Sequence, residues 1–402
     1  MSAVELRASA SLASIFGLRL LGMFVILPVF AIYAEQIRGG SDLTLVGIAI
    51  GAYGLTQAIL QIPFGWWSDK YGRKPVIYIG LAIFAAGSFI AAAAPDIYIV
   101  ILGRVLQGAG AISAAVMAMS ADLTREEHRT KAMAMIGSTI GLAFGFSLIA
   151  SPWLTGMIGV PGLFALTGVL AIVAMLVVWR IVPDGSAQTA PTPDTAALRE
   201  FWKALIDPQL ARLNYGIFAL HAVLMALFIA VPFALRDAGL PLAEHWKVYL
   251  PSIAGSFVLM LPAILGRGAA RRLKGYFLAC VALILLSQLL LPQLASGVVM
   301  LGFFLLLFFT PFNVLEAMLP SLTSRLAPPQ SKGIAIGLYS SVQFFGTFFG
   351  AAGGGYLYGE WGMPGVVVAN AALLVIWLVV ATGMKAPGIP STAAHASGQA
   401  AR

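Results

Sequence analysis

The sequence is poor in charged residues and contains a single cysteine. Only 10% of its 402 residues are Asp, Glu, Lys or Arg, and 60% are hydrophobic, whereas a soluble domain is about 25% charged. So apolar a chain lacks the polar surface that a water-soluble protein needs. This argues against a soluble enzyme and, in spite of a net charge of +8, against a nucleic-acid-binding protein. Cys280 alone permits no intrachain disulfide and no cysteine-based metal cluster.

Long apolar runs dominate the chain instead. A membrane-spanning helix needs ~20 apolar residues, and the runs delimited by charge, Gly and Pro predict twelve such helices. We interpret the first run as a retained helix and not as a signal peptide, because no small-residue cleavage site follows it. The predicted spans are 11–34, 43–66, 75–94, 97–121, 131–155, 161–182, 209–235, 246–266, 275–293, 296–321, 333–356 and 362–384.

The basic residues predict how these spans are oriented. If the amino terminus lies inside, the inner segments hold 19 Lys and Arg residues and the outer segments hold 3. Cytoplasmic loops of membrane proteins collect Lys and Arg. We therefore expect both chain ends in the cytoplasm, and the net positive charge reflects orientation in the lipid bilayer.

Similar residues recur half a chain apart. Lys131 and Lys332 follow corresponding spans at an offset of 201 residues, and Pro63 and Pro262 precede corresponding basic loops at an offset of 199. Two homologous six-helix halves around a linker are a transporter architecture. The predicted fold is an all-α membrane protein with twelve transmembrane helices in two pseudo-symmetric six-helix bundles.

The longest connection divides these two halves. It begins as a stretch rich in Pro, Gly and Ser. Residues 196–206 suit an interfacial helix with Trp202 and Lys203 at headgroup level, and they suit an unstructured tether equally well. The predicted units are an amino-terminal bundle (1–182), a cytoplasmic linker (183–208), a carboxy-terminal bundle (209–384) and a cytoplasmic tail (385–402).

A loop bounded by glycines follows the second predicted span, over residues 65–75. Its glycines permit a tight turn, and Asp69 can pair with Arg73. The loop could be simply a basic inner loop, but its spacing resembles the signature loop of the major facilitator superfamily. Trp67 and Lys70 stand where that family usually has Leu and Arg. The resemblance implies a conformational switch that comprises Gly65, Asp69, Gly72, Arg73, Lys74 and Asp122.

Other stretches resemble the drug–proton antiporter branch of this superfamily, namely 18–24, 121–126, 243–249 and 313–317. Arg104 matches the arginine of the family's second motif, which is implicated in proton coupling. The fifth span departs from the antiporter motif, because Ser or Thr replaces most of the motif's glycines. The resemblance implies alternating access in a bacterial inner membrane, with the proton gradient as energy source and no cofactor. It also implies that this chain lacks the soluble domain that some members carry after the last span.

Four ionisable side chains lie well inside the predicted spans, away from the span ends, and such groups are costly enough to suggest function. Arg19, Arg104, His221 and Glu316 occupy spans 1, 4, 7 and 10, which line the central cavity in the family. Glu316 is the first candidate for proton coupling, because a cation and a proton can compete for a carboxylate. His221 is the second, because histidine titrates near neutral pH. A structural ion pair of Glu316 with an arginine and a packing role for His221 are the alternatives.

Polar side chains recur at helical spacing near these groups. They could line the transport pathway or join neighbouring helices, and the spacing alone leaves both interpretations open. The cavity-lining candidates are Arg19, Tyr53, Gln57, Gln61, Gln107, Asn313, Tyr339 and Gln343.

The expected function is proton-coupled export of small amphipathic compounds by a monomeric transporter. Its expected partners are the substrate, protons and the bilayer, without nucleic acid and without a metal. One alternative is an efflux carrier of narrow specificity for a sugar or metabolite, which two cavity arginines would suit. The remaining alternative is a membrane scaffold or sensor that transports nothing. An enzyme is not expected, because the sequence contains no nucleophile–base pair and no paired carboxylates.

Overall fold

The computed structural model describes residues 1–183, 195–265, 273–328 and 331–384. Helices make up almost all of this part of the chain, and it contains no strand longer than the single bridge between Arg38 and Asp96. The helices are α1 (Ala3–Phe24), α2 (Leu27–Ala34), α3 (Leu43–Tyr71), α4 (Arg73–Ala92), α5 (Ile97–Ala109), α6 (Ser113–Asp122), α7 (Glu126–Arg180), α8 (Thr195–Ile206), α9 (Pro208–Asp237), η1 (Leu242–Glu244), α10 (Trp246–Leu265), α11 (Leu273–Leu294), α12 (Val298–Leu326) and α13 (Lys332–Thr382).

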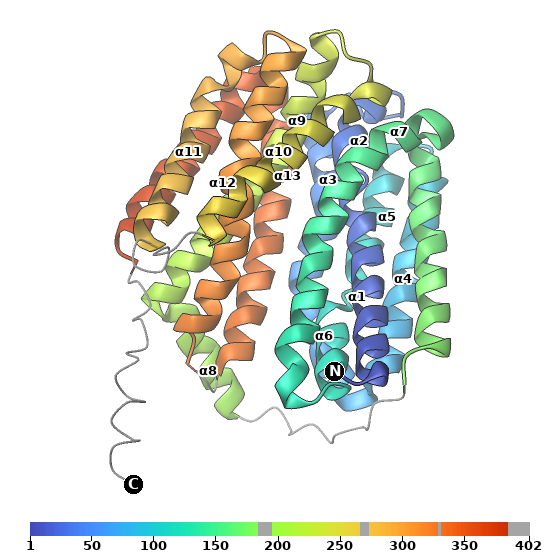
Figure 1. The fold of residues 1–402 in the computed structure, drawn as a ribbon. Coiled ribbons are helices and arrows are strands. Elements are labelled where there is room, and N and C mark those ends of the chain that lie inside the picture. Colours follow the sequence, from blue (N-terminus) through green and yellow to red (C-terminus); the bar gives the residue numbers. More distant parts are fainter. Residues whose placement is uncertain (184–194, 266–272, 329–330, 385–402) are drawn as a thin grey trace.

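These helices form two bundles side by side, α1 to α7 and α9 to α13 (Figure 1). Among the described residues, nine segments are long and apolar enough to cross a membrane. Two of these segments, α7 and α13, turn back at Gly159 and Gly362, whose φ angles of 67° and 61° favour glycine. When α7 and α13 are each counted as two helices and α10 is added, the described part of the chain contains twelve long apolar helices, and the predicted fold class is confirmed.

Two predicted spans are broken, which the apolar runs did not reveal. The first span divides into α1 and α2 because Pro28 has no N–H to continue the helical ladder. At the break the N–H of Val29 donates to Ile26, which frees the carbonyl of Val25, and the hydroxyl of Ser151 on α7 donates to that carbonyl. The fourth span divides into α5 and α6 at Gly110. The first helix also begins earlier than predicted, because Ser2 and Glu5 form a capping box.

Residues 195–206 of the linker are helical, as one of the two interpretations predicted. Helix α8 lies at the same end of the molecule as the amino terminus (Figure 1). We call this end the amino-terminal face, and the other end the opposite face. Trp202 and Ile206 are exposed on α8, while Lys203 pairs with Glu200 at 2.6 Å. Residues 184–194, also expected in the linker, lie outside the described part.

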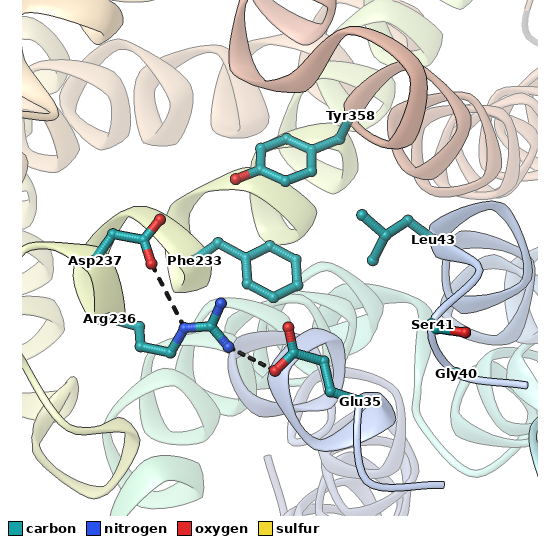
Figure 2. A pocket seen from close by; sticks show the side chains of 8 residues that line it. All are labelled: Glu35, Gly40, Ser41, Leu43, Phe233, Arg236, Asp237 and Tyr358. Atoms are coloured by element: carbon teal, nitrogen blue, oxygen red, sulfur yellow. Dashed lines mark hydrogen bonds and ion pairs between the residues drawn. The ribbon is translucent and has the colours of Figure 1, made fainter. Parts of the chain in front are cut away.

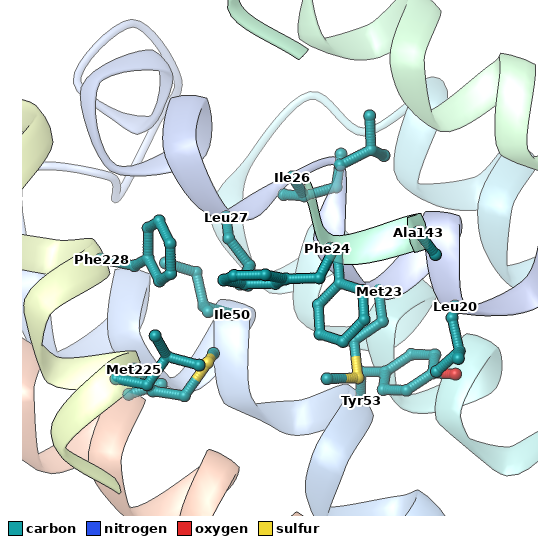
Figure 3. Packing of buried hydrophobic residues seen from close by; sticks show 14 of the residues in the cluster. Leu20, Met23, Phe24, Ile26, Leu27, Ile50, Tyr53, Ala143, Met225 and Phe228 are labelled. Carbon is teal, nitrogen blue, oxygen red and sulfur yellow. The ribbon is translucent and has the colours of Figure 1, made fainter. Parts of the chain in front are cut away.

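The two halves share one apolar core. Phe144 on α7 contacts Phe228 on α9 and Phe309 on α12, with ring centroids 6.2 and 5.8 Å apart. Figure 3 shows the neighbouring packing, in which Phe228 and Met225 point toward Leu27 of the other half. The halves therefore meet through buried side chains in the middle of the molecule.

Backbone contact between α3 and α13 brings the halves close toward the opposite face. A side chain on Gly47 would collide with the carbonyl of Ala351, and one on Gly355 would collide with the carbonyl of Leu43. Small residues permit this close approach of membrane helices. In contrast, Gly141 on α7 and Gly337 on α13 have open space beside them. The structure is thus tightly closed on the opposite face.

Candidate functional site

A carboxylate, an imidazole and an amide meet in the carboxy-terminal half, on three different helices. Helix α12 carries Glu316, α9 carries His221 and α13 carries Gln343. The Gln343 Nε2 atom lies 2.8 Å from His221 Nε2 and donates to Glu316 Oε1 at 3.3 Å. His221 Nε2 also lies 3.8 Å from Glu316 Oε2. The two titratable groups singled out in the sequence are therefore neighbours, joined by one amide.

This cluster is mostly buried without being sealed. The Glu316 side chain is 28% exposed and that of His221 is 7% exposed. His221 Nδ1 lies 3.2 Å from the carbonyl of Ile217, and its ring packs against Phe312. In the described part of the chain, Glu316 Oε2 has no hydrogen-bond partner. A carboxylate with one free oxygen in a partly open site can accept a proton or contact a cation.

Two other predicted residues lie near this cluster in different ways. Asn313, one turn before Glu316, donates to Ser256 of α10 at 2.9 Å and so joins two helices. Tyr339, one turn before Gln343, is buried and lies close enough to Glu316 to interact with its charge. Its hydroxyl finds no partner among the described residues. Tyr339 therefore borders the cluster, and Asn313 has a packing contact of its own.

In the amino-terminal half, Arg104 ties three helices together. Its guanidinium donates to the carbonyls of Gly22, Ala49 and Ile50 at 3.2, 3.3 and 3.2 Å. It also donates to Gln107 Oε1 at 2.8 Å. Only 1% of Arg104 is exposed. Since all of these partners are neutral, this buried cation is held by dipoles and not by a carboxylate.

Gln107 extends the network to two more helices. Its amide donates to Ser88 on α4 at 2.8 Å and to Thr167 on α7 at 3.5 Å. Thr167 also contacts Ser88 at 3.2 Å. We did not predict these two hydroxyl residues, because a lone Ser or Thr in an apolar run shows no periodic pattern.

A second arginine of this half, Arg19, is also buried, with 2% of its surface exposed. It donates to Ser113 Oγ at 2.8 Å and to Gln57 Oε1. The guanidiniums of Arg19 and Arg104 lie 5.6 and 5.1 Å from the centre of the Tyr53 ring. Tyr53 therefore interacts with both cations through its ring. Ser113 was also missed, because it begins the unforeseen helix α6.

Gln61 lies on α3 one turn after Gln57 and two turns after Tyr53, and it joins the two halves. Its amide donates to the carbonyl of Gly337 at 3.1 Å and to Ser341 Oγ at 2.8 Å, both on α13. Gln57 and Tyr53 instead contact groups within their own half. All three residues thus join helices, and whether they also line the transport pathway stays a prediction.

The four intramembrane ionisable groups form two clusters, one in each half. Arg19 and Arg104 share Tyr53, whereas His221 and Glu316 share Gln343. The ion pair between Glu316 and an arginine is not the arrangement seen here, since the titratable side chain beside Glu316 in the described residues is His221. That both clusters line one cavity remains a prediction.

The predicted switch residues gather at the amino-terminal face. Gly72, with a φ of 96°, turns the chain between α3 and α4. Arg73 then pairs with Asp69 and with Asp122, the latter at 3.1 Å, and donates to Ser68 at 2.9 Å. Lys74 follows at the start of α4, and Gly65 lies one turn before Asp69. The cluster therefore links three helices of the amino-terminal half.

Replacing Arg73 by alanine is expected to change the balance between the two open states. The change removes two contacts to α3 (Ser68 and Asp69) and one to α6 (Asp122), at about 1–2 kcal/mol in total for partly exposed groups, a shift of roughly fivefold to thirtyfold. We expect the labelling rate of a cysteine at Gly141, relative to that of one at Ser41, to change by this factor in a Cys280→Ser background. Lys70→Ala is the control, since Lys70 lies over the Trp66 ring instead. Unchanged labelling on both faces would reject this role.

At the opposite face an ion pair crosses between the halves. Arg236 at the end of α9 donates to Glu35, just after α2, at 2.6 Å. Figure 2 shows this pair beside a pocket of about 280 Å³ between the halves. Phe233 and Tyr358 stack in the same place, with ring centroids 5.4 Å apart. Sequence reasoning missed the pair, because isolated charges at span ends resemble ordinary loop residues.

Glu35→Gln is expected to make the opposite face open more readily. The pair is roughly half exposed, so its loss is worth about 0.2–1 kcal/mol, or up to about a fivefold faster labelling of a cysteine at Ser41. Asp237→Asn is the matched control, because Asp237 contacts Arg236 within one half, at 3.6 Å. Equal labelling rates in Glu35→Gln and Asp237→Asn would show that the Glu35–Arg236 pair does not hold the opposite face closed.

His245, near this face, is a buried histidine of a different kind. Its Nε2 atom lies 3.1 Å from the carbonyl of Leu240. Burial lowers the pKa of the His245 imidazole to about 4. The ring is therefore uncharged at neutral pH. Within the described residues, no group of three or more His, Cys, Asp or Glu side chains could hold a metal ion.

Two six-helix bundles with buried polar clusters define a multi-pass membrane transporter. The chain belongs to the Major Facilitator Superfamily, whose sequence model matches residues 12–341.

Known transport proteins resemble this chain over nearly its whole length. The chain is 45% identical over 387 residues to the inner membrane transport protein YajR of Escherichia coli K12, covering 96% of this chain and 85% of YajR. It is 28% identical over 388 residues to the multidrug resistance protein MdtH of Cronobacter sakazakii, covering 92% and 93%. Among solved structures, it resembles a bacterial homolog of the human lysosomal transporter Spinster in its inward-facing and unoccupied conformation. The TM-score is 0.74 at 15% identity, over 97% of this chain and all of the other, which supports the fold alone.

Proposed function

We propose that the protein is a proton-coupled antiporter that exports small amphipathic compounds across a bacterial inner membrane. The observation that carries this proposal is the Glu316–His221–Gln343 cluster, where a partly open carboxylate with one unpartnered oxygen lies beside an imidazole. A proton and a cationic substrate would compete for Glu316, which is the requirement for exchange. The names of YajR and MdtH support an inner-membrane location and efflux of drug-like compounds.

Each polar cluster has a separate part in this proposal. Glu316 and His221 take up and release the proton. Arg104 and Arg19 do not lose theirs, so they hold broken helices together and set a positive field in the amino-terminal half. The switch cluster and the Glu35–Arg236 pair bias the two faces, and rocking of the two bundles exposes the site to each side in turn.

The experiment is transport by the purified full chain in proteoliposomes. Ethidium, an amphipathic cation, serves as the probe, with xylose and lactate for the sugar and anion alternatives. We expect an imposed pH gradient to drive ethidium against its concentration gradient. Movement of xylose or lactate alone would favour the narrow-specificity carrier, and movement of none of them under any gradient would contradict the proposal.

A further inference from the structure

The amide of Gln343 contacts both titratable groups of the cluster. Its nitrogen lies 2.8 Å from His221 Nε2 and 3.3 Å from Glu316 Oε1. An amide nitrogen only donates, so His221 Nε2 must accept. The ring proton then lies on Nδ1, which faces the Ile217 carbonyl at 3.2 Å. The geometry is that of a neutral imidazole beside a carboxyl group whose Oε1 accepts from the amide.

A proton added to the imidazole is incompatible with this arrangement. A proton on His221 Nε2 would place an N–H against the N–H of Gln343. The conflict is relieved when the amide rotates by half a turn, so that its oxygen accepts from the imidazole. In that orientation Gln343 no longer donates to Glu316, and the charged imidazole can approach Glu316 Oε2, now 3.8 Å away.

We propose that Gln343 is a positioning residue whose amide orientation couples the protonation of His221 to that of Glu316. One orientation stabilises the neutral imidazole and the ionised carboxylate. The reversed orientation stabilises the pair with one added proton, which comes from water on the open side and raises the net charge of the pair by one. No other bond forms or breaks. The inference rests on the proposed function only in assuming that this proton drives transport.

Few other groups can perform this task. In the described residues of the helices that contact α12, namely α7, α9, α10, α11 and α13, the other titratable side chain close enough to interact with the charge of Glu316 is Tyr339. Its hydroxyl donates to neither member of the pair. Gln343 is thus the one described side chain that contacts both.

The test is an infrared titration of the full chain in lipid vesicles, which needs no substrate. The carbonyl band of protonated carboxyl groups is followed with pH, and the component that Glu316→Gln removes belongs to Glu316. Gln343→Met deletes both N–H groups at similar volume. Without a donor to the ionised carboxylate, we expect half of the Glu316 band to form about one pH unit higher than in the wild type.

Gln288→Met is the matched control for loss of a buried amide. Gln288 is fully buried in the same half and accepts from Asn370 at 3.0 Å, but it does not contact the pair. We expect no displacement of the Glu316 band in this variant. An unshifted band in Gln343→Met, or an equal shift in both variants, would overturn the inference.

A second measurement uses the unaltered protein, so it holds even if Gln343→Met fails to fold. The chain has four histidines, and His221→Asn identifies the signal of His221 in nitrogen magnetic resonance spectra. At high pH we expect the proton on Nδ1, and a proton on Nε2 would contradict the inference. Ethidium transport tests the proposed function separately, because neither of these readouts depends on a substrate.

Discussion

Glu316→Gln is expected to abolish transport driven by a pH gradient, while insertion and folding stay intact. Glutamine has the shape of protonated glutamate but cannot release a proton. At one proton per substrate, a gradient of two pH units supports up to about 100-fold accumulation, since each unit is equivalent to a factor of ten. In the variant we expect ethidium only to equilibrate, with no accumulation.

The control for this prediction is another glutamate of the same half. Glu360 on α13 is exposed, so Glu360→Gln changes the net charge equally without altering the cluster. We expect Glu360→Gln to accumulate ethidium as the wild type does. If Glu316→Gln also moves ethidium against an imposed gradient at the wild-type rate, Glu316 is not the coupling site.

Arg104→Met is expected to lower thermal stability sharply and to reduce transport below one tenth. A buried ion pair can often be replaced by apolar groups without loss, but the partners of Arg104 are mainly backbone carbonyls, which stay behind. The carbonyls of Gly22, Ala49 and Ile50 would lose a donor, at about 1–3 kcal/mol for each buried group left unsatisfied. Thermal unfolding in detergent and ethidium transport measure the two effects.

Two further variants separate geometry from charge at this position. Arg104→Lys keeps the charge but replaces a planar fork by a point charge, so we expect only partial recovery of stability. Arg180→Met removes an exposed arginine that stacks on Trp179 at 4.3 Å, and should be neutral. Wild-type unfolding and transport in Arg104→Met would show that this network is not essential.

The number and type of helices could be predicted from composition, but their breaks could not. Each apolar run is long enough to span a bilayer, and this property does not depend on neighbours. Whether the helix bends or breaks at Pro28 depends on which group donates a hydrogen bond to the carbonyls freed there, such as that of Val25. Here that partner is Ser151, 126 residues away. Membrane helices tolerate breaks only where the surrounding protein supplies such partners.

The candidate site, too, could be predicted from the sequence only in part. Glu316 and His221 could be singled out because a charge inside a membrane is costly. Their junction through Gln343 could not, since it requires the relative rotation of three helices. The roles of Gln61 and Gln57 also depend on which half each one faces. The Glu35–Arg236 pair joins residues 201 positions apart, and neither end carries a local signal.

The most direct test of the proposed mechanism is substrate-dependent proton release by the purified protein in weakly buffered detergent. Adding ethidium to the wild type should displace a proton and acidify the solution. The same addition to Glu316→Gln should release none, and His221→Ala should release less than the wild type. Equal proton release by the wild type and Glu316→Gln would contradict a transport mechanism in which substrate and proton compete for Glu316.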